Sequence, residues 1–199
     1  MAGKLQRQKQ EKKESLVDAS YDLFLKKGFN KTSIDDIVKK ANVAKGTFYL
    51  YFKDKSDVME NIVLRMSSRI LVEAYRAADE RGCDDLVENI IFVVDYIVEY
   101  FKRNKLVLQM IKRDFSWPLI REKIDELSPE YGEALEVLES FLTHPYFAGQ
   151  DPDEVFKLLF LIIDMCGSVC YSSIIHNQPD DIDHMKPFLY GVIRKILKK

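Results

Sequence analysis

Apolar residues recur every three or four positions along most of this chain, whereas the strict alternation that a β-strand requires is nearly absent. The first periodic stretch covers about residues 9–27, with Leu16, Ala19, Leu23 and Phe24 on one face and Gly28 as its stop. Glycine (8 residues) and proline (6 residues) are scarce and mostly separate one such stretch from the next. The pattern therefore predicts an all-α protein.

Capping residues refine the expected helix boundaries. Thr32 or Ser33 offers an N-cap oxygen, and Asp35 or Asp36 three residues later completes a capping-box pattern. Asn42 suits a left-handed turn residue. After the first helix we expect about nine more, at about residues 34–41, 45–52, 55–78, 85–103, 106–113, 118–125, 128–142, 151–177 and 182–198.

Charge is divided unevenly along the sequence. Residues 1–55 carry thirteen Lys/Arg and seven Asp/Glu, and the other 144 residues carry seventeen basic and twenty-five acidic side chains, for a net charge of −2. A basic segment is either a solvated face without further use or a surface for a polyanion. We expect a basic head over residues 1–55 and a helical body over residues 56–199.

The head has the pattern of a helix-turn-helix, in which a first helix braces a second one in the major groove of DNA. The inward positions are apolar: Ile34, Ile37, Val38, Ala41, Val43, Phe48 and Phe52. The outward positions are Lys45, Thr47, Tyr49, Leu50 and Tyr51. A lysine and free backbone N–H groups hold phosphates, tyrosine hydroxyls donate to phosphate oxygens, and threonine reaches a base edge. Gly46 lets the backbone come close to the duplex.

Two motifs, G-F-x-x-T-S-I-x-D-I from Gly28 and G-T-F-Y-x-Y-F-K-x-K from Gly46, resemble the tetracycline-repressor (TetR) family of bacterial transcription regulators. The resemblance covers about residues 14–60. It implies that phosphates are held by Thr32, Ser33, Lys45, Tyr49, Tyr51 and Lys55. It also implies that Gly46, Thr47 and Leu50 face the bases, and that the partner is a near-palindromic double-stranded DNA operator.

The chain departs from the family pattern at Val38, Asn42 and Ala44. Ala44 matters most, because a serine or threonine there would cap the recognition helix and contribute about 1 kcal/mol. Leu50 is unusual at an exposed recognition position. Either it is a tolerated surface leucine or it contacts a thymine methyl.

Members of this family carry a helical ligand-binding body and dimerise through their last two long helices, and this body is similar. Small residues in the last two expected helices suit close helix–helix approach between two copies: Cys166, Gly167, Cys170, Ser173 and Gly191. Packing inside one chain is the other interpretation of the same residues. The resemblance implies a homodimer.

A small-molecule effector is the second partner that the resemblance implies. Phe92, Tyr96 and Tyr100 recur every four residues and share a helix face. The other residues expected around an apolar pocket are Met110, Phe115, Trp117, Phe160, Asp164 and Tyr171. Plain core packing explains the aromatic stripe equally well, and Asp164 in an apolar run is either salt-bridged or in contact with a ligand.

The sequence shows no cofactor loop and no nucleophile–base pair, so we do not expect an enzyme. His176, His184, Asp180, Asp181 and Asp183 form at most a surface metal site, and we assign no metal and no cofactor. Cys166 and Cys170, one helical turn apart, are poorly placed for a disulfide. A thiol sensor is therefore a minor alternative.

Three cysteines are too few for a disulfide framework, and residues 1–13 lack the apolar core of a signal peptide. Residues 155–175 are apolar, but Lys157 and Asp164 within them favour a packed helix over a membrane span. We expect a cytoplasmic, dimeric, ligand-responsive repressor. The alternative is a DNA-binding structural or partner-controlled factor without a small-molecule pocket.

Overall fold

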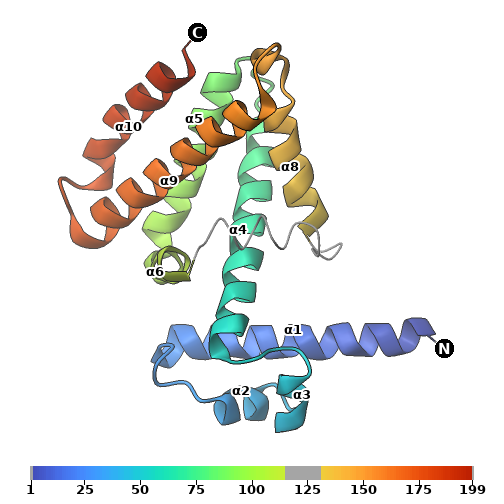
Figure 1. Cartoon of the computed structure of the whole chain (residues 1–199). Helices are drawn as coiled ribbons and strands as arrows, with labels where there is room; N and C mark the ends of the chain where they lie inside the picture. Colours follow the sequence, from blue (N-terminus) through green and yellow to red (C-terminus); the bar gives the residue numbers. More distant parts are fainter. Residues whose placement is uncertain (1, 115–130, 199) are drawn as a thin grey trace. The chain divides into compact units, whose positions relative to one another are not determined.

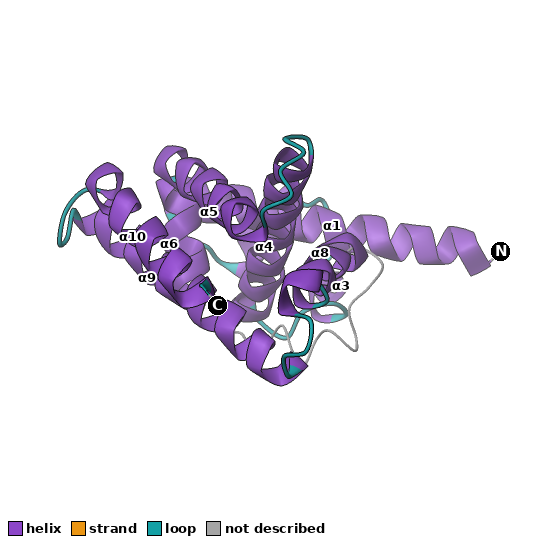
Figure 2. Ribbon diagram, turned by 90° about the horizontal axis from the view of Figure 1, so that it is seen from above, coloured by secondary structure: helices purple, strands orange, loops and turns teal. Residues whose placement is uncertain are grey.

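The computed structural model describes residues 2–114 and 131–198, and over these residues it contains nine α-helices, one 3-10 helix and no strand (Figures 1 and 2). The all-α fold is confirmed. The chain divides into two compact units, the first unit (Met1–Arg65) and the second unit (Met66–Lys199). The division falls within a continuous helix, α4 (Lys55–Asp79), instead of at its start, where the sequence had suggested a boundary.

The first unit contains α1 (Ala2–Lys27), α2 (Ile34–Lys40), α3 (Lys45–Tyr49) and the start of α4. Gly28, at φ 81°, ends α1 in the left-handed conformation that glycine tolerates best. Ser33 and Asp36 form the complete capping box at the start of α2. α1 begins earlier than expected, whereas α3 is shorter than the expected helix over residues 45–52.

Apolar side chains from all four of these helices are buried in the first unit. Phe48 of α3 packs its ring 5.7 Å from that of Phe52, and Phe24 of α1 lies 5.1 Å from Phe29. The largest fully buried side chains of this unit are those of Leu16, Ile37, Phe48, Val58, Met59 and Ile62. The inward set expected of a helix-turn-helix therefore supplies much of this core, with Leu16 of α1 and the first turns of α4 as the rest.

The second unit holds the rest of α4 and then α5 (Leu86–Arg103), α6 (Lys105–Asp114), α8 (Gly132–Leu142), a 3-10 helix (Pro145–Phe147), α9 (Pro152–His176) and α10 (Ile182–Leu197). Side chains of Asp85, Asp151 and Asp181 cap α5, α9 and α10 by accepting backbone N–H bonds. These boundaries agree with the expected ones to within a few residues. The helix expected at 118–125, and the start of the one expected at 128–142, lie outside the described residues.

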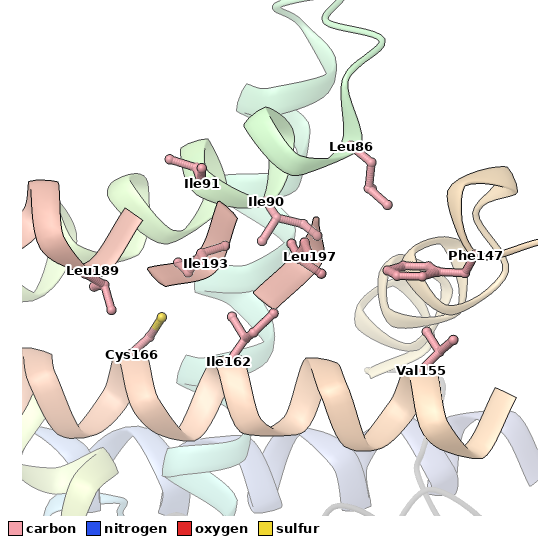
Figure 3. Packing of buried hydrophobic residues seen from close by; sticks show 10 residues of the cluster. All are labelled: Leu86, Ile90, Ile91, Phe147, Val155, Ile162, Cys166, Leu189, Ile193 and Leu197. Carbon is pink, nitrogen blue, oxygen red and sulfur yellow. The ribbon is translucent and has the colours of Figure 1, made fainter. Parts of the chain in front are cut away.

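The core of the second unit lies between α5, α9 and α10 (Figure 3). Leu86, Ile90 and Ile91 come from α5, Val155, Ile162 and Cys166 from α9, and Leu189, Ile193 and Leu197 from α10, with Phe147 closing one end. Four ion pairs reinforce the contact of α5 with α10: Lys186–Asp95 (2.7 Å), Lys186–Glu99, Lys102–Asp183 (2.7 Å) and Arg194–Glu88 (2.8 Å).

α9 differs from the fully packed helix that its composition suggested. One face carries the buried Ile162, Cys166 and Cys170, whereas Leu161 and Asp164 on the opposite face are exposed. Among the described helices α9 is the one long and apolar enough to cross a bilayer by length and composition. Its buried face belongs to the core with α5 and α10, whereas apolar residues such as Leu161 and Ile163 stay exposed.

Candidate functional site

The turn between α2 and α3 has the geometry of a helix-turn-helix. Asn42 adopts the left-handed conformation (φ 54°), and the N–H of Val43 donates to the carbonyl of Val38 at 3.0 Å. Ala44 is the N-cap of α3 and, as its methyl side chain dictates, makes no side-chain cap bond. α3 is therefore held mainly by packing, with Phe48 fully buried beneath it.

The outer surface of α3 is open. Lys45, Gly46, Tyr49 and Leu50 are exposed, and Leu50 leaves 79% of its surface accessible. A Cβ built on Gly46 would meet no atom within 4 Å, so nothing within the protein requires glycine there. Thr47 and Tyr51 are half-buried at the edges of this surface. We call Lys45, Gly46, Thr47, Tyr49 and Leu50 the recognition face.

Lys45 has a partner inside the first unit. Its Nζ lies 2.8 Å from Oδ1 of Asp35 at the start of α2, and the hydrogen bond to that carboxylate raises the pKa of Lys45. Both side chains are exposed, so the pair is screened by solvent and costs little to open. A phosphate that binds Lys45 must compete with Asp35.

The structure gives Thr32 and Ser33 roles different from phosphate binding. Thr32 is 1% exposed, and its hydroxyl donates to the carbonyl of Gly28 at 2.8 Å, so its side chain cannot reach a phosphate. Ser33 is exposed, but its hydroxyl and backbone N–H both donate to Asp36, at 2.6 and 2.8 Å. Lys27 binds the same carboxylate at 2.7 Å and, with Ser33, holds the pKa of Asp36 far below its usual range. Both residues therefore build the entry to α2.

Lys55 is also engaged within the protein. Its Nζ donates to the carbonyls of Phe29 and Thr32 at 2.9 and 2.6 Å and stands 4.6 Å from the centre of the Phe29 ring. Lys55 thus ties α4 to the segment between α1 and α2. These bonds indicate a structural role for Lys55 instead of the expected phosphate contact, because two of its three ammonium hydrogens already have acceptors.

Of the residues expected at a dimer interface, three face the interior of the chain. Cys166, Cys170 and Ser173 are buried, and burial raises the pKa of each of the two thiols to about 12. This correction also removes the basis for a thiol sensor at these positions, because a reactive cysteine needs an accessible thiolate. Gly167 and Gly191 are half-buried, and a Cβ on either would meet no atom within 4 Å.

The residues expected around a ligand pocket lie in different parts of the second unit. Phe92 and Tyr96 pack beside Ala74 and Ala78 of α4, and the guanidinium of Arg81 stands 4.3 Å from the centre of the Phe92 ring. Asp164, a pocket candidate from the sequence, is exposed on α9, on the face opposite the core, so the structure does not place its carboxylate in a buried pocket.

The remaining pocket candidates are Tyr100, Met110, Phe160 and Tyr171, all half-buried, with the Tyr171 ring 5.3 Å from that of His176. Phe115 and Trp117 lie outside the described residues. Asp180, Asp181 and His184 bring one ligand atom each within 4.8 Å of one another, and the His184–Asp181 hydrogen bond (2.6 Å) at the start of α10 explains why they gather.

Residues 16–62 match the family model described as bacterial regulatory proteins of the tetR family. This segment runs from the buried Leu16 of α1 through the recognition face to the buried Ile62 of α4. This chain is a TetR-family transcriptional regulator. The family consists of DNA-binding transcription regulators.

Relatives of this TetR-family chain extend beyond the head. It is 23% identical over 144 residues to the fatty acid metabolism regulator protein of Bacillus subtilis, which covers 72% of this chain and 73% of that one. It is 39% identical over 62 residues to the regulator AcrR of Shigella flexneri, covering 31% and 29% of the two chains.

Two solved structures share the fold. FadR of Bacillus subtilis in complex with stearoyl-CoA has a TM-score of 0.60 at 20% identity and covers 90% of this chain and 96% of that one. FadR of Thermus thermophilus in complex with lauroyl-CoA has a TM-score of 0.61 at 20% identity and covers 94% and 91%.

Sequence reasoning considered Asp35 only as a capping residue and missed its ion pair with Lys45. Two carboxylates occupy the first turn of α2, and a capping box uses only one of them, Asp36. The second carboxylate, which the capping box leaves unused, was the signal available in the sequence. In the folded head it lies beside Lys45. Only the folded turn shows that the two side chains meet.

Proposed function

We propose that this TetR-family regulator is a dimeric, cytoplasmic repressor that binds a near-palindromic operator and is released from it by a small, largely apolar effector. The observation that carries the operator contact is the recognition face. Gly46, Tyr49 and Leu50 are exposed, while Phe48 between them is fully buried. We attribute the exposure of these residues to the DNA that the recognition face binds.

Selection of bound duplexes from a random pool tests the operator contact. We expect a twofold-related sequence to emerge, because a symmetric dimer presents two identical α3 helices. Lys45→Ala should weaken binding to all sequences and lower the salt dependence by about one phosphate contact per head. Thr47→Ala should instead change which bases are selected. A pool that yields no preferred sequence would refute specific operator binding.

The outer faces of α9 and α10 support the dimer. Leu161 is 60% exposed, and Phe188 and Val192 of α10 are 72% and 39% exposed. On the same two helices, a Cβ built on Gly167 or Gly191 would meet no atom within 4 Å. We therefore move the interface from the buried Cys166, Cys170 and Ser173 to this outer surface. Burying such large side chains against a second copy would contribute about 1.5–3 kcal/mol for each one fully covered.

Sedimentation of glycine variants tests this interface. Gly191→Glu or Gly167→Glu should give a folded monomer, because a charged side chain would enter the apolar contact. Gly132→Glu on α8 is the matched control, since a Cβ there also meets no atom within 4 Å. A dimer that survives both substitutions on α9 and α10 would place the interface elsewhere.

The relatives support a long-chain acyl effector. Two structures with this fold are complexes with stearoyl-CoA and lauroyl-CoA, and a relative over 72% of the chain is a fatty acid metabolism regulator. Because Asp164 lies outside any buried site, the chain gives no reason to expect a cationic effector. These relatives favour an effector-responsive regulator over a structural DNA-binding factor.

Release of operator by acyl-CoA esters of increasing chain length tests the effector class. We expect affinity for the operator to fall about 5- to 150-fold, the range of ordinary allosteric coupling, with free coenzyme A inactive. Binding should also change the fluorescence of Trp117, the only tryptophan of the chain. If neither acyl-CoA esters nor a panel of aromatic compounds changes operator affinity, the effector proposal fails while the operator contact stands.

A further inference from the structure

We propose that the N-terminal part of α1 is a second DNA contact, in which Lys9, Lys12 and Lys13 hold phosphates of the duplex beside the sequence that α3 reads. The proposal rests on the operator binding proposed above. It concerns a segment that precedes the residues matched to the TetR-family model, which begin at residue 16.

α1 leaves the core of the first unit next to the helix-turn-helix. The hydroxyl of Ser15 donates to the carbonyl of Ala41 at 3.2 Å, and Ala41 is the C-cap of α2, immediately before the turn into α3. From Ser15 back to Ala2 the helix continues for about 20 Å at 1.5 Å per residue. Figure 1 shows this part of α1 extending past α2 and α3. Residues 7–12 are exposed.

The lysines of this segment lie on one side of the helix. Lys9, Lys13, Leu16 and Ser20 follow one another at helical spacing, with Lys12 beside them. Leu16 and Ser20 have no exposed surface, so the lysine side continues the face by which α1 enters the core. The three lysines make no ion pair with any side chain that the structure describes.

The acidic residues of the segment lie on the other side and are engaged there. Glu11 accepts from Arg7 at 3.0 Å, and Glu14 accepts from the amide of Gln10 at 3.0 Å. The helix is therefore polarised into a free cationic side and an internally paired side.

Duplex DNA is the occupant that these features favour. It carries one phosphate charge per 1.7 Å of axis, so an arm of about 20 Å that starts beside the helix-turn-helix turn can follow the backbone next to the operator. An anionic membrane is less suited, because Leu5 is the only large apolar residue between positions 2 and 13. Interfacial helices need an apolar face to insert.

The test compares the full-length protein with a variant carrying Lys9→Gln, Lys12→Gln and Lys13→Gln. Glutamine keeps high helix propensity while removing the charge. The matched control removes three exposed charges from the second unit, with Arg103→Gln, Lys105→Gln and Lys198→Gln. Each protein is titrated with two duplexes, one limited to the selected operator and one extended by about 10 base pairs of unrelated sequence on each side, at 50 and 200 mM salt.

Wild type and control should gain affinity on the extended duplex, and the triple lysine variant should lose that gain. If all three lysines hold phosphates, the advantage of wild type over the variant should shrink by about 40-fold per head between the two salt concentrations, at a slope of about 0.9 per contact. On the short duplex the two proteins should bind alike.

Two different failures can be told apart. Absence of any preferred duplex for wild type would refute the proposed operator binding itself. Selective binding of the operator with equal affinity of wild type and variant for the extended duplex would overturn only the arm proposal. A third outcome would also overturn the arm proposal. If wild type and variant bind the extended duplex equally, but only wild type sediments with anionic phospholipid vesicles, the arm binds a membrane.

Discussion

Gly46→Ala should stabilise the folded protein and lower its affinity for operator DNA. Gly46 is the second residue of α3, is exposed, and has nothing within 4 Å of the position where a Cβ would stand. Its φ lies outside the left-handed region, so alanine meets no backbone strain. If glycine is needed at this position, the reason is the close approach of a partner.

The two effects have opposite signs, and the loss of DNA affinity is the larger of the two. Alanine in place of glycine gains about 0.8–1.0 kcal/mol inside a helix, and we expect about half of this, roughly 0.5 kcal/mol, in the first turn of so short a helix. On DNA, the added methyl would push away a phosphate that approaches the backbone N–H of Gly46. Losing one hydrogen bond to a charged group costs about 1.5–3 kcal/mol, which is roughly a 10- to 100-fold loss of affinity per head.

Urea unfolding followed by circular dichroism measures the first effect, and titration of labelled operator measures the second. Gly132→Ala on α8 is the matched control, because a Cβ there also enters open space but lies in the second unit. The control should leave operator affinity unchanged. A Gly46→Ala protein that gains stability and binds the operator as tightly as wild type would refute a close backbone approach at this residue.

Three further outcomes follow from particular contacts. Ala44→Ser should stabilise α3 by about 1 kcal/mol in urea unfolding by supplying the missing N-cap oxygen, and an unchanged midpoint would show that packing alone fixes this helix. Lys186→Gln should raise the pH midpoint of acid unfolding. Despite desolvation, hydrogen bonds from Lys186 lower the pKa values of Asp95 and Glu99 on α5. The stabilisation that these carboxylates contribute is present above about pH 4 and is lost as pH falls, so without Lys186 the protein should unfold at a higher pH. Cys83, which is half-buried, should react with iodoacetamide at pH 8 well before the two buried cysteines of α9, and equal rates measured by mass spectrometry would contradict the burial described.

The sequence by itself determined most of the helices and several of their ends, because these depend on neighbouring residues. Gly28 and Asn42 adopt the left-handed conformations expected of them, Ser33 and Asp36 form the expected capping box, and α5, α9 and α10 begin next to capping aspartates. The recognition face was predictable for the same reason. Its spacing separates the buried Phe48 from the exposed positions on either side.

Contacts between distant segments were decided only by the tertiary structure. Lys55 was expected at a phosphate, but folding brings it to the carbonyls of Phe29 and Thr32, and the Thr32 side chain turns inward. Small residues suit close approach within a chain as well as between chains. Sequence therefore could not tell that Cys166 faces the core, whereas the Cβ of Gly191 would point into open space. An apolar run such as α9 likewise indicates that part of its surface is covered. Its neighbours in space determine which face α5 and α10 cover and which face stays exposed.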